Sequence, residues 1–478
     1  MNGCLSIEFL GKKAKCRQGN GKFRFLALVS GGEMVYNSRR STLEEPPMPY
    51  EHDELNKRSA QRRAYALKRK KIQQRRRVRT IVTLVAILAV CGLIGGVLLL
   101  RGDDTPTEPS IQATQPPVTT VPPETQPQEP QTVINLTFGG DVNITDASVA
   151  AGEQGGYYNY GEVFKDVMPA LAASDLTVLN FEGNFYGAPY GTASSSAPVA
   201  LAEGLKAAGV DMLQLANSYT IANGIIGMKQ TLDAVRGAGL TPLGVYASNE
   251  EFRNSGGYTM VSIRGVRVAI VAFTKGMGSL GLPSGSENCV NVLYEDYASS
   301  YKKVNTEGIT AILNAANEEK PDVTIALVHW GSEYNDYPSD SQAKIVQLMQ
   351  GLGVDAIVGT HPHYVQQVVF DESAGTVVAY SLGDFYGSGE KNGTYYSVLL
   401  NLQVTKDNLT GETKITSCSH TPIYLLTPER DGEPLRLMRM EAAIESYEGN
   451  HVDKITEIAY NNMLYALKRA NSRVETGK

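Results

Sequence analysis

The stretch that decides the fold reads D-A-I-V-G-T-H-P-H at residues 355–363 and V-V-A-Y-S-L-G-D-F at residues 377–385. The apolar run at 356–358 follows a helix-like segment, which is typical of a buried parallel strand. Chain that leaves the carboxyl end of such a strand lines the usual ligand crevice of an open α/β sheet. His361 and His363 stand there, two residues apart. Because alternate side chains of an extended segment point the same way, we expect both imidazoles to face one bound ion.

Outward from this stretch, apolar runs alternate with helix-like segments between residues 132 and 428. The alternation, interrupted by hairpin signals such as Arg264-Gly265, predicts an α/β domain with one or more mixed central sheets flanked by helices. A domain of about 300 residues buries a large core. Residues 429–478 hold two further helix-like segments, and these either pack on the domain or extend from it.

Acidic, amide and imidazole side chains recur where these apolar runs end. The candidates are Asp141, Asn180, Glu182, Asn217, His329, His361 and His363. Each one alone is explained by a helix cap or by an ordinary polar residue with a hydrogen-bond partner. Together they form a set of ligands that divalent cations accept, and they belong to the same edge of the predicted sheet. We therefore expect them to converge on one pocket that binds one or two divalent metal ions.

The first 131 residues differ in composition from the rest of the chain. Residues 1–79 are predicted to be cytoplasmic and mostly disordered, ending in a run dense in Lys and Arg at 57–79. Such a run suits nucleic acid, but here it directly precedes an apolar segment, so we expect no nucleic-acid partner. That segment, residues 80–100, has no charged residue and is long enough to cross a bilayer. Residues 101–131 are rich in Pro and Thr and predict an extended linker.

The charge bias around the apolar segment predicts the topology. Basic residues on its N-terminal side place that side in the cytoplasm. The sequence therefore predicts a single-pass protein of a bacterial plasma membrane with its main domain outside. Of the five cysteines, only Cys289 and Cys418 are then external, and nothing in the sequence brings them within bridging distance. The absence of a C-x-x-C pair excludes a zinc ribbon.

The sequence resembles the CapA family of bacterial capsule or poly-γ-glutamate synthesis proteins, which is similar to the calcineurin-type metallophosphoesterases. The resemblance spans most of residues 132–390, in the order of the family's motifs. The matching motifs are F-G-G-D-V at 138–142, L-N-F-E-G at 179–183, H-W-G-S-E-Y at 329–334, G-V-D-A-I-V-G-T-H-P-H at 353–363 and Y-S-L-G-D-F at 380–385.

The resemblance implies roles for the candidate residues. Asp141, Asn217, His329, His361 and His363 fall where the phosphoesterases bind two metal ions, and Glu182 falls near a bridging acid. One segment departs from the family pattern A-N-N-H-A-x-D-x-G, because residues 216–224 read A-N-S-Y-T-I-A-N-G. Tyr219 replaces a histidine that contacts phosphate and assists the leaving group, and Ala222 replaces the aspartate. A tyrosine is a poorer acid than histidine at neutral pH.

Two functions follow from this resemblance. The first is a metal-dependent hydrolase or transferase that acts on a cell-envelope polymer or its precursor, with Glu182, His329 and Tyr219 in the reaction. The second is a non-catalytic component that binds such a polymer or scaffolds an export complex with other capsule-synthesis membrane proteins. The intact histidines favour the first function, whereas Tyr219 and Ala222 favour the second.

Overall fold

The structure is a computed structural model that describes residues 6–9, 12–19, 22–26, 130–449 and 455–475. The chain divides into two units, Met1–Thr120 and Val121–Lys478. The predicted basic run, the apolar segment and nearly all of the linker lie outside the described residues. Within the described part of the chain, no helix combines the length and the apolar character that crossing a membrane requires.

A small antiparallel sheet forms near the N-terminus. It consists of β1 (Ser6–Phe9), β2 (Lys12–Gly19) and β3 (Lys22–Leu26), in that order. The sheet lies within residues 1–79, which the sequence predicts to be mostly disordered, and its formation has a local cause. The physical reason lies between β2 and β3, where Gly19 pairs with Lys22. The two residues between them are Asn-Gly in the sequence, which is the strongest short hairpin signal.

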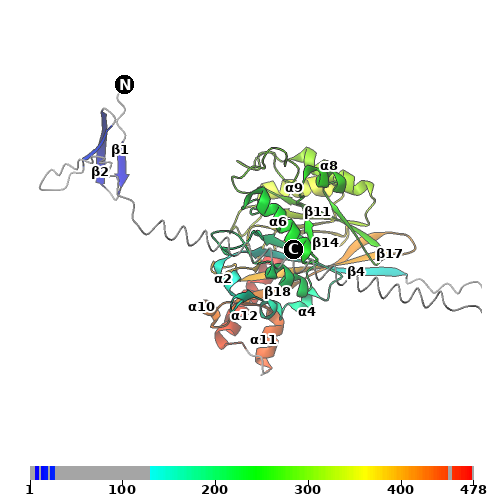
Figure 1. Cartoon of the computed structure of the whole chain (residues 1–478). Helices are drawn as coiled ribbons and strands as arrows, with labels where there is room; N and C mark the ends of the chain where they lie inside the picture. Colours follow the sequence, from blue (N-terminus) through cyan, green and yellow to red (C-terminus); the bar gives the residue numbers. More distant parts are fainter. Residues whose placement is uncertain (1–5, 10–11, 20–21, 27–129, 450–454, 476–478) are drawn as a thin grey trace, which may run out of the picture. The chain divides into compact units, whose positions relative to one another are not determined.

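Two large mixed sheets form the centre of the second unit (Figure 1). The larger sheet has the order β19-β18-β17-β4-β7-β8-β9, and β16 pairs with β4. Its strands are β4 (Gln131–Asn143), β7 (Leu176–Glu182), β8 (Met212–Gln214), β9 (Thr241–Leu243), β16 (Asp384–Tyr386), β17 (Tyr396–Asp407), β18 (Thr413–Leu426) and β19 (Arg436–Arg439). The smaller sheet has the order β10-β11-β12-β13-β15-β14. Its strands are β10 (Thr259–Ile263), β11 (Val266–Thr274), β12 (Val323–His329), β13 (Ala356–Thr360), β14 (Val368–Asp371) and β15 (Thr376–Ala379).

The two sheets pack face to face, as the alternation of buried side chains along β11 shows. Val268 and Ile270 share one core with Ile134 and other apolar residues of the larger sheet. Val271 and Phe273, one position out of phase, belong to a separate core that includes helical residues. Because neighbouring side chains of a strand point to opposite faces, both faces of this sheet are covered. Each buried Val or Ile contributes about 1.5–3 kcal/mol relative to exposure.

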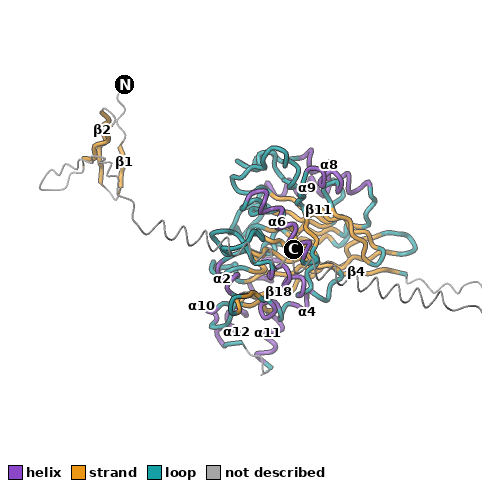
Figure 2. The backbone as a smooth tube through the Cα atoms, in the orientation of Figure 1, coloured by secondary structure: helices purple, strands orange, loops and turns teal. Residues whose placement is uncertain are grey.

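Helices cover the outer face of each sheet, which makes four layers in all. Figure 2 shows the strands in the middle of this unit with helices and loops around them. Residues of α5 (Ala200–Ala207) and α6 (Gly224–Gly237) share a core with the larger sheet. Residues of α8 (Thr306–Glu318) and α9 (Asp340–Gly351) pack on the smaller one. The shorter helices are α2 (Asp146–Ala150), α3 (Gly161–Phe164), α4 (Met168–Leu171), α7 (Asn249–Ser255) and α10 (Pro428–Asp431).

The C-terminal helices pack on the domain, which answers the question that the sequence left open. They are α11 (Met440–Glu448) and α12 (Glu457–Glu475). Met463 and Ala466 of α12 are fully buried and share the inter-sheet core with Tyr424 of β18. The domain predicted to end at residue 428 therefore includes the described part of residues 429–478.

The parallel strands bring their carboxyl ends to a common edge. In the larger sheet β4, β7 and β8 are parallel neighbours, and in the smaller sheet β11, β12 and β13 are. The backbone amide of His361, just after β13, donates to Asp141 Oδ2 in β4 at 3.1 Å. The exits of the two sheets therefore meet at one place, as the motif positions predicted.

Candidate metal centre

An irregularity in strand pairing directs the side chain of Asp141 toward the site. The pairing of β4 with β7 shifts between Phe138 and Asp141, where the sequence is Gly139-Gly140. A Cβ atom at Gly140 would lie only 1.8 Å from the carbonyl oxygen of Gly383, so no side chain fits there. This close approach lets the Asp141 amide donate to the same Gly383 oxygen at 3.0 Å. The carboxylate of Asp141 is then fully buried at the junction of the two sheets.

Two buried amide side chains hold the carboxylates in place. Asn180 Nδ2 donates to Asp141 Oδ1 at 2.7 Å and to Glu182 Oε1 at 3.0 Å. Asn217 Nδ2 donates to Asn180 Oδ1 at 3.2 Å and to the Phe181 carbonyl at 2.6 Å. Asn217 Oδ1 accepts from the amide of Tyr219 at 3.0 Å. Asn180 therefore orients the two carboxylates, and Asn217 orients Asn180. The amide oxygens through which the two asparagines could bind an ion already accept hydrogen bonds.

His329, at the end of β12, is held between a backbone amide and a carboxylate. Its Nε2 accepts from the Ser218 amide at 3.2 Å, so Nδ1 carries the ring proton. Nδ1 lies 3.2 Å from Glu182 Oε1. The ring centroid of His329 is 4.5 Å from that of His361. His329, Glu182 and His361 therefore form one compact, buried group.

The turn that carries His361 and His363 differs from the extended segment that we predicted. Both residues adopt the left-handed region, with φ of 93° for His361 and 59° for His363. The two imidazoles share the site, with ring centroids 6.1 Å apart, but through a tight turn rather than through strand alternation. Non-glycine residues rarely occupy this region, and such strain is concentrated at functional sites.

Three groups of side chains have the spacing of metal ligands. Within each group the ligand atoms lie within 4.8 Å of one another. The groups are Glu182, His329 and His361; Asp141, His363 and Asp384; and Glu333, His361 and His363. His361 Nδ1 is buried and has no hydrogen-bond partner in the described part of the chain. A buried nitrogen left in that state beside a carboxylate and a second imidazole fits a cation ligand.

Burial controls the protonation of the two central carboxylates. It raises the pKa of Asp141 to about 6, although the nearby His363 lowers it. Burial and the charge of Asp141 raise the pKa of Glu182 well above its usual value. Both shifts reflect the cost of placing negative charge away from water, and a bound cation would remove that cost.

The three histidines are shifted in different directions. Burial lowers the pKa of His361 to about 2, helped by the positive charge of Lys275, whose Nζ lies 3.4 Å from His361 Nε2. Burial and His361 likewise hold the pKa of His329 well below its usual value. Burial also opposes the charge of His363, but Asp384, 2.7 Å away, raises its pKa well above the usual range. His329 and His361 are thus neutral, and His361 Nδ1 has a lone pair free to bind an ion. His329 would bind one only after its hydrogen bond with the Ser218 amide or its Nδ1 proton is given up.

A cavity of about 190 Å³ opens onto this cluster. Tyr219 and Tyr334 line it with His363 and Asp384. Tyr219 is 39% exposed and lies at the mouth of the cavity. Partial burial, together with the nearby Glu182 and Glu333, raises the pKa of Tyr219 to about 12, so its hydroxyl stays protonated at neutral pH.

The structure brings together all the residues that the sequence singled out: Asp141, Asn180, Glu182, Asn217, Tyr219, His329, His361 and His363. Asp384, Glu333 and Lys275 complete the cluster and were not assigned to it. Asp384 stands in the Y-S-L-G-D-F motif at a strand exit, so its position was a usable signal. Glu333 likewise stands in the H-W-G-S-E-Y motif, after β12. Lys275 carries no such signal, because it lies outside the matching motifs, directly after β11.

The model of a protein family described as "Bacterial capsule synthesis protein PGA_cap" matches residues 135–388, which are more than half of the chain. The chain belongs to this family. The matched segment begins within β4 and ends beyond β16, so it contains every residue of the candidate metal centre. The resemblance drawn from the sequence motifs is therefore confirmed.

Two bacterial proteins named CapA are similar in sequence to this chain. The PGA biosynthesis protein CapA of Bacillus subtilis (strain 168) is 28% identical over 289 residues, which cover 59% of this chain and 71% of that protein. The capsule biosynthesis protein CapA of Bacillus anthracis is 28% identical over 239 residues, which cover 48% of this chain and 54% of that protein. The chain thus spans about half the length of the second relative.

Solved structures similar to this PGA_cap protein include phosphoesterases. The calcineurin-like phosphoesterase YfkN from Bacillus subtilis aligns with a TM-score of 0.39 at 13% identity, covering 72% of this chain and 99% of that one. A phosphatase from Mycoplasma pneumoniae aligns with a TM-score of 0.39 at 16% identity, covering 63% of this chain and 96% of that one.

Proposed function

We propose that this protein is a membrane-anchored, extracellular component of capsule or poly-γ-glutamate-type polymer synthesis or export, and that its α/β domain is a metal-dependent hydrolase or transferase. The family and the names of its relatives support the link to capsule polymers. The buried cluster supports the chemistry. The cell-envelope polymer or its precursor is the proposed substrate.

The observation that carries the enzyme proposal is the environment of His361 Nδ1. This nitrogen is buried without a hydrogen-bond partner among the described residues. It belongs to a group with Glu182 and His329 whose ligand atoms are within 4.8 Å of one another. Leaving such a nitrogen unsatisfied costs about 1–3 kcal/mol, which ligation of a cation would recover. Asp141, His363 and Asp384 would hold a second ion, which would displace the proton that His363 carries in the metal-free site.

A divalent ion at these residues would supply Lewis acidity to a substrate oxygen and lower the pKa of bound water. The chain's own contribution is orientation and charge. Asn180 fixes Asp141 and Glu182 through two hydrogen bonds from one amide nitrogen. The Ser218 amide fixes the tautomer of His329 and so keeps its proton on Nδ1, beside Glu182.

The second candidate function is a non-catalytic polymer-binding or scaffold component, and Tyr219 is the observation that favours it. With its pKa raised to about 12, Tyr219 is a much weaker general acid for a leaving group than a histidine at this position would be. Its exposure at the mouth still suits a hydrogen bond to a bound ligand. Histidine at this position would restore a group that titrates near neutrality.

The experiment that separates the two functions measures hydrolysis of 4-nitrophenyl phosphate by the full-length protein with added Mn²⁺ or Zn²⁺. The enzyme proposal expects turnover that EDTA removes and that Glu182→Gln abolishes. Tyr219→His should raise the rate if the missing acid limits the reaction. Failure of wild type and Tyr219→His to turn over this ester, with metal bound, would contradict the enzyme proposal and favour the binding component.

The membrane anchor is part of the proposal and rests on the sequence alone. The uncharged residues 80–100 and the basic residues before them support an anchor with a cytoplasmic N-terminus. Other capsule-synthesis membrane proteins and the lipid bilayer are the proposed partners, and no nucleic acid is expected.

A further inference from the structure

The cavity at the candidate metal centre carries a marked imbalance of charge. Its described lining includes four carboxylates, from Glu182, Glu333, Asp384 and Glu390. Among the same lining residues the one lysine or arginine is Lys391. His363 also lines the cavity, but it is buried and paired with Asp384, so Lys391 is the exposed cation that an anionic ligand meets among these lining residues.

Lys391 is held above an aromatic ring of the site. Its Nζ lies 3.3 Å from the centroid of the Tyr334 ring. The Tyr334 ring in turn stacks on the His363 ring, with centroids 5.2 Å apart and an interplanar angle of 24°. A cation over a tyrosine face is attracted by the ring's quadrupole. The ammonium group is thus connected through one ring to a histidine of the metal centre.

The position of Tyr334 is set by its backbone. Tyr334 adopts the left-handed region with φ of 58°, and its amide donates to the Pro362 carbonyl at 2.9 Å. The neighbouring ring of Tyr364 packs edge-on at 5.8 Å. Neighbouring contacts hold Tyr334 in this strained conformation, and strained residues held in this way are common at functional sites.

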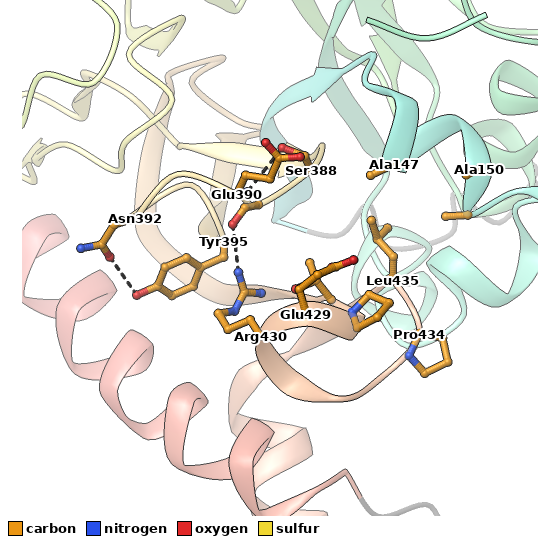
Figure 3. A pocket seen from close by; sticks show the side chains of 14 residues that line it. Ala147, Ala150, Ser388, Glu390, Asn392, Tyr395, Glu429, Arg430, Pro434 and Leu435 are labelled. Atoms are coloured by element: carbon orange, nitrogen blue, oxygen red, sulfur yellow. Dashed lines mark hydrogen bonds between the residues drawn. The ribbon is translucent and has the colours of Figure 1, made fainter.

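The loop that carries Lys391 is fixed on its far side. Thr394 donates to the Lys391 carbonyl through its amide at 3.0 Å and through its hydroxyl at 2.9 Å. Arg430 Nη1 donates to the Gly389 carbonyl at 3.0 Å, and the Tyr395 hydroxyl donates to Asn392 at 3.2 Å (Figure 3). Gly389, Asn392, Tyr395 and Arg430 line a second cavity of about 970 Å³. The backbone is therefore anchored while the Lys391 side chain stays exposed at the mouth.

No carboxylate of the described residues forms an ion pair with Lys391, so an ordinary surface salt bridge does not account for its placement. Lys391 also lies just beyond residue 388, where the match to the family ends. We propose that Lys391, positioned by Tyr334, is an anion-binding subsite that contacts a carboxylate or phosphate of the substrate next to the group held at the metal centre. This inference rests on the proposed function and names the substrate as anionic at that point.

The test is calorimetric titration of the metal-loaded full-length protein with penta-L-glutamate, with penta-L-glutamine as a neutral peptide of matched length, and with inorganic phosphate. Lys391→Gln should weaken binding of pentaglutamate about fivefold, the upper range for an exposed ion pair, and leave pentaglutamine unchanged. The control Lys165→Gln removes the same charge from an exposed pair with Glu162 and should change neither affinity.

Variants of the ring separate positioning from charge. Tyr334→Phe retains the aromatic face and should bind pentaglutamate as wild type does, whereas Tyr334→Ala should lose about as much affinity as Lys391→Gln. If Lys391→Gln lowers the affinity for inorganic phosphate but leaves the affinity for pentaglutamate unchanged, the subsite binds a phosphate group.

The proposal is overturned if Lys391→Gln binds both anions as wild type does, or if wild type binds the two peptides equally and Lys391→Gln leaves phosphate unaffected. If the wild-type protein takes up no metal but still needs Lys391 for pentaglutamate, the enzyme proposal fails while the subsite stands.

Discussion

Replacing Asn180 with Ala should destabilise the metal-free protein more than any exposed asparagine does. The side chain is 1% exposed, and its Nδ2 donates to Asp141 at 2.7 Å and to Glu182 at 3.0 Å. Each hydrogen bond to a charged group contributes about 1.5–3 kcal/mol. The pKa of Glu182 is raised well above its usual value, so its bond belongs at the low end of that range. The expected loss is about 3 kcal/mol in the free energy of unfolding.

Urea unfolding of the full-length protein in the presence of EDTA measures this loss, followed by tryptophan fluorescence of the buried Trp330. The matched control is Asn392→Ala, because Asn392 is exposed and accepts one hydrogen bond from Tyr395. Its expected cost is within about 0.5 kcal/mol. If Asn180→Ala costs no more than Asn392→Ala, the two carboxylates do not depend on this amide and the reasoning is wrong.

Three further predictions concern packing, protons and topology. Gly140→Ala should lower the free energy of unfolding by about 3 kcal/mol, measured by thermal unfolding, because a Cβ atom there meets the Gly383 oxygen. The control Gly237→Ala, in open space at the end of α6, should leave the stability unchanged or raise it slightly. Equal melting temperatures for the two variants would contradict this prediction. Metal affinity should fall at least about tenfold per pH unit below pH 6, because protons compete with the metal for Asp141, whose pKa is raised to about 6. His361, whose pKa is lowered to about 2, stays unprotonated over this range. A metal titration that finds the same affinity from pH 5 to pH 7 would refute this prediction. Protease added to intact protoplasts should digest the 132–428 domain, and its protection would contradict the predicted orientation.

The sequence was sufficient to predict that the side chains of the candidate metal centre lie together. Asp141, His329 and His361 each follow an apolar run, and parallel strands present their carboxyl ends at a common edge. That rule does not depend on the details of packing, so residues more than two hundred positions apart were placed in one pocket. In the structure β4 pairs in parallel with β7, and β12 with β13.

Other features depend on contacts that no local pattern reveals. The direction of the Asn180 and Asn217 amides follows from neighbours on other strands, so the sequence predicted ligands where the structure has hydrogen-bonded supports. The left-handed turn at His361 and His363 depends on the meeting of two sheets. The fourteen residues of β18, Thr413–Leu426, were not predicted as a strand, because their exposed half is polar and Pro422 interrupts the pattern.

The metal content of the purified full-length protein tests the central claim most directly. Elemental analysis after gel filtration should find one or two divalent ions per chain in the wild type. His361→Ala should lose metal while its circular dichroism stays unchanged. His420→Ala is the control, because His420 lies on β18, bonded to Asn471, and its removal should leave the metal content as it was. A wild-type protein that is folded and takes up no divalent ion, or equal metal in the two variants, would contradict the account.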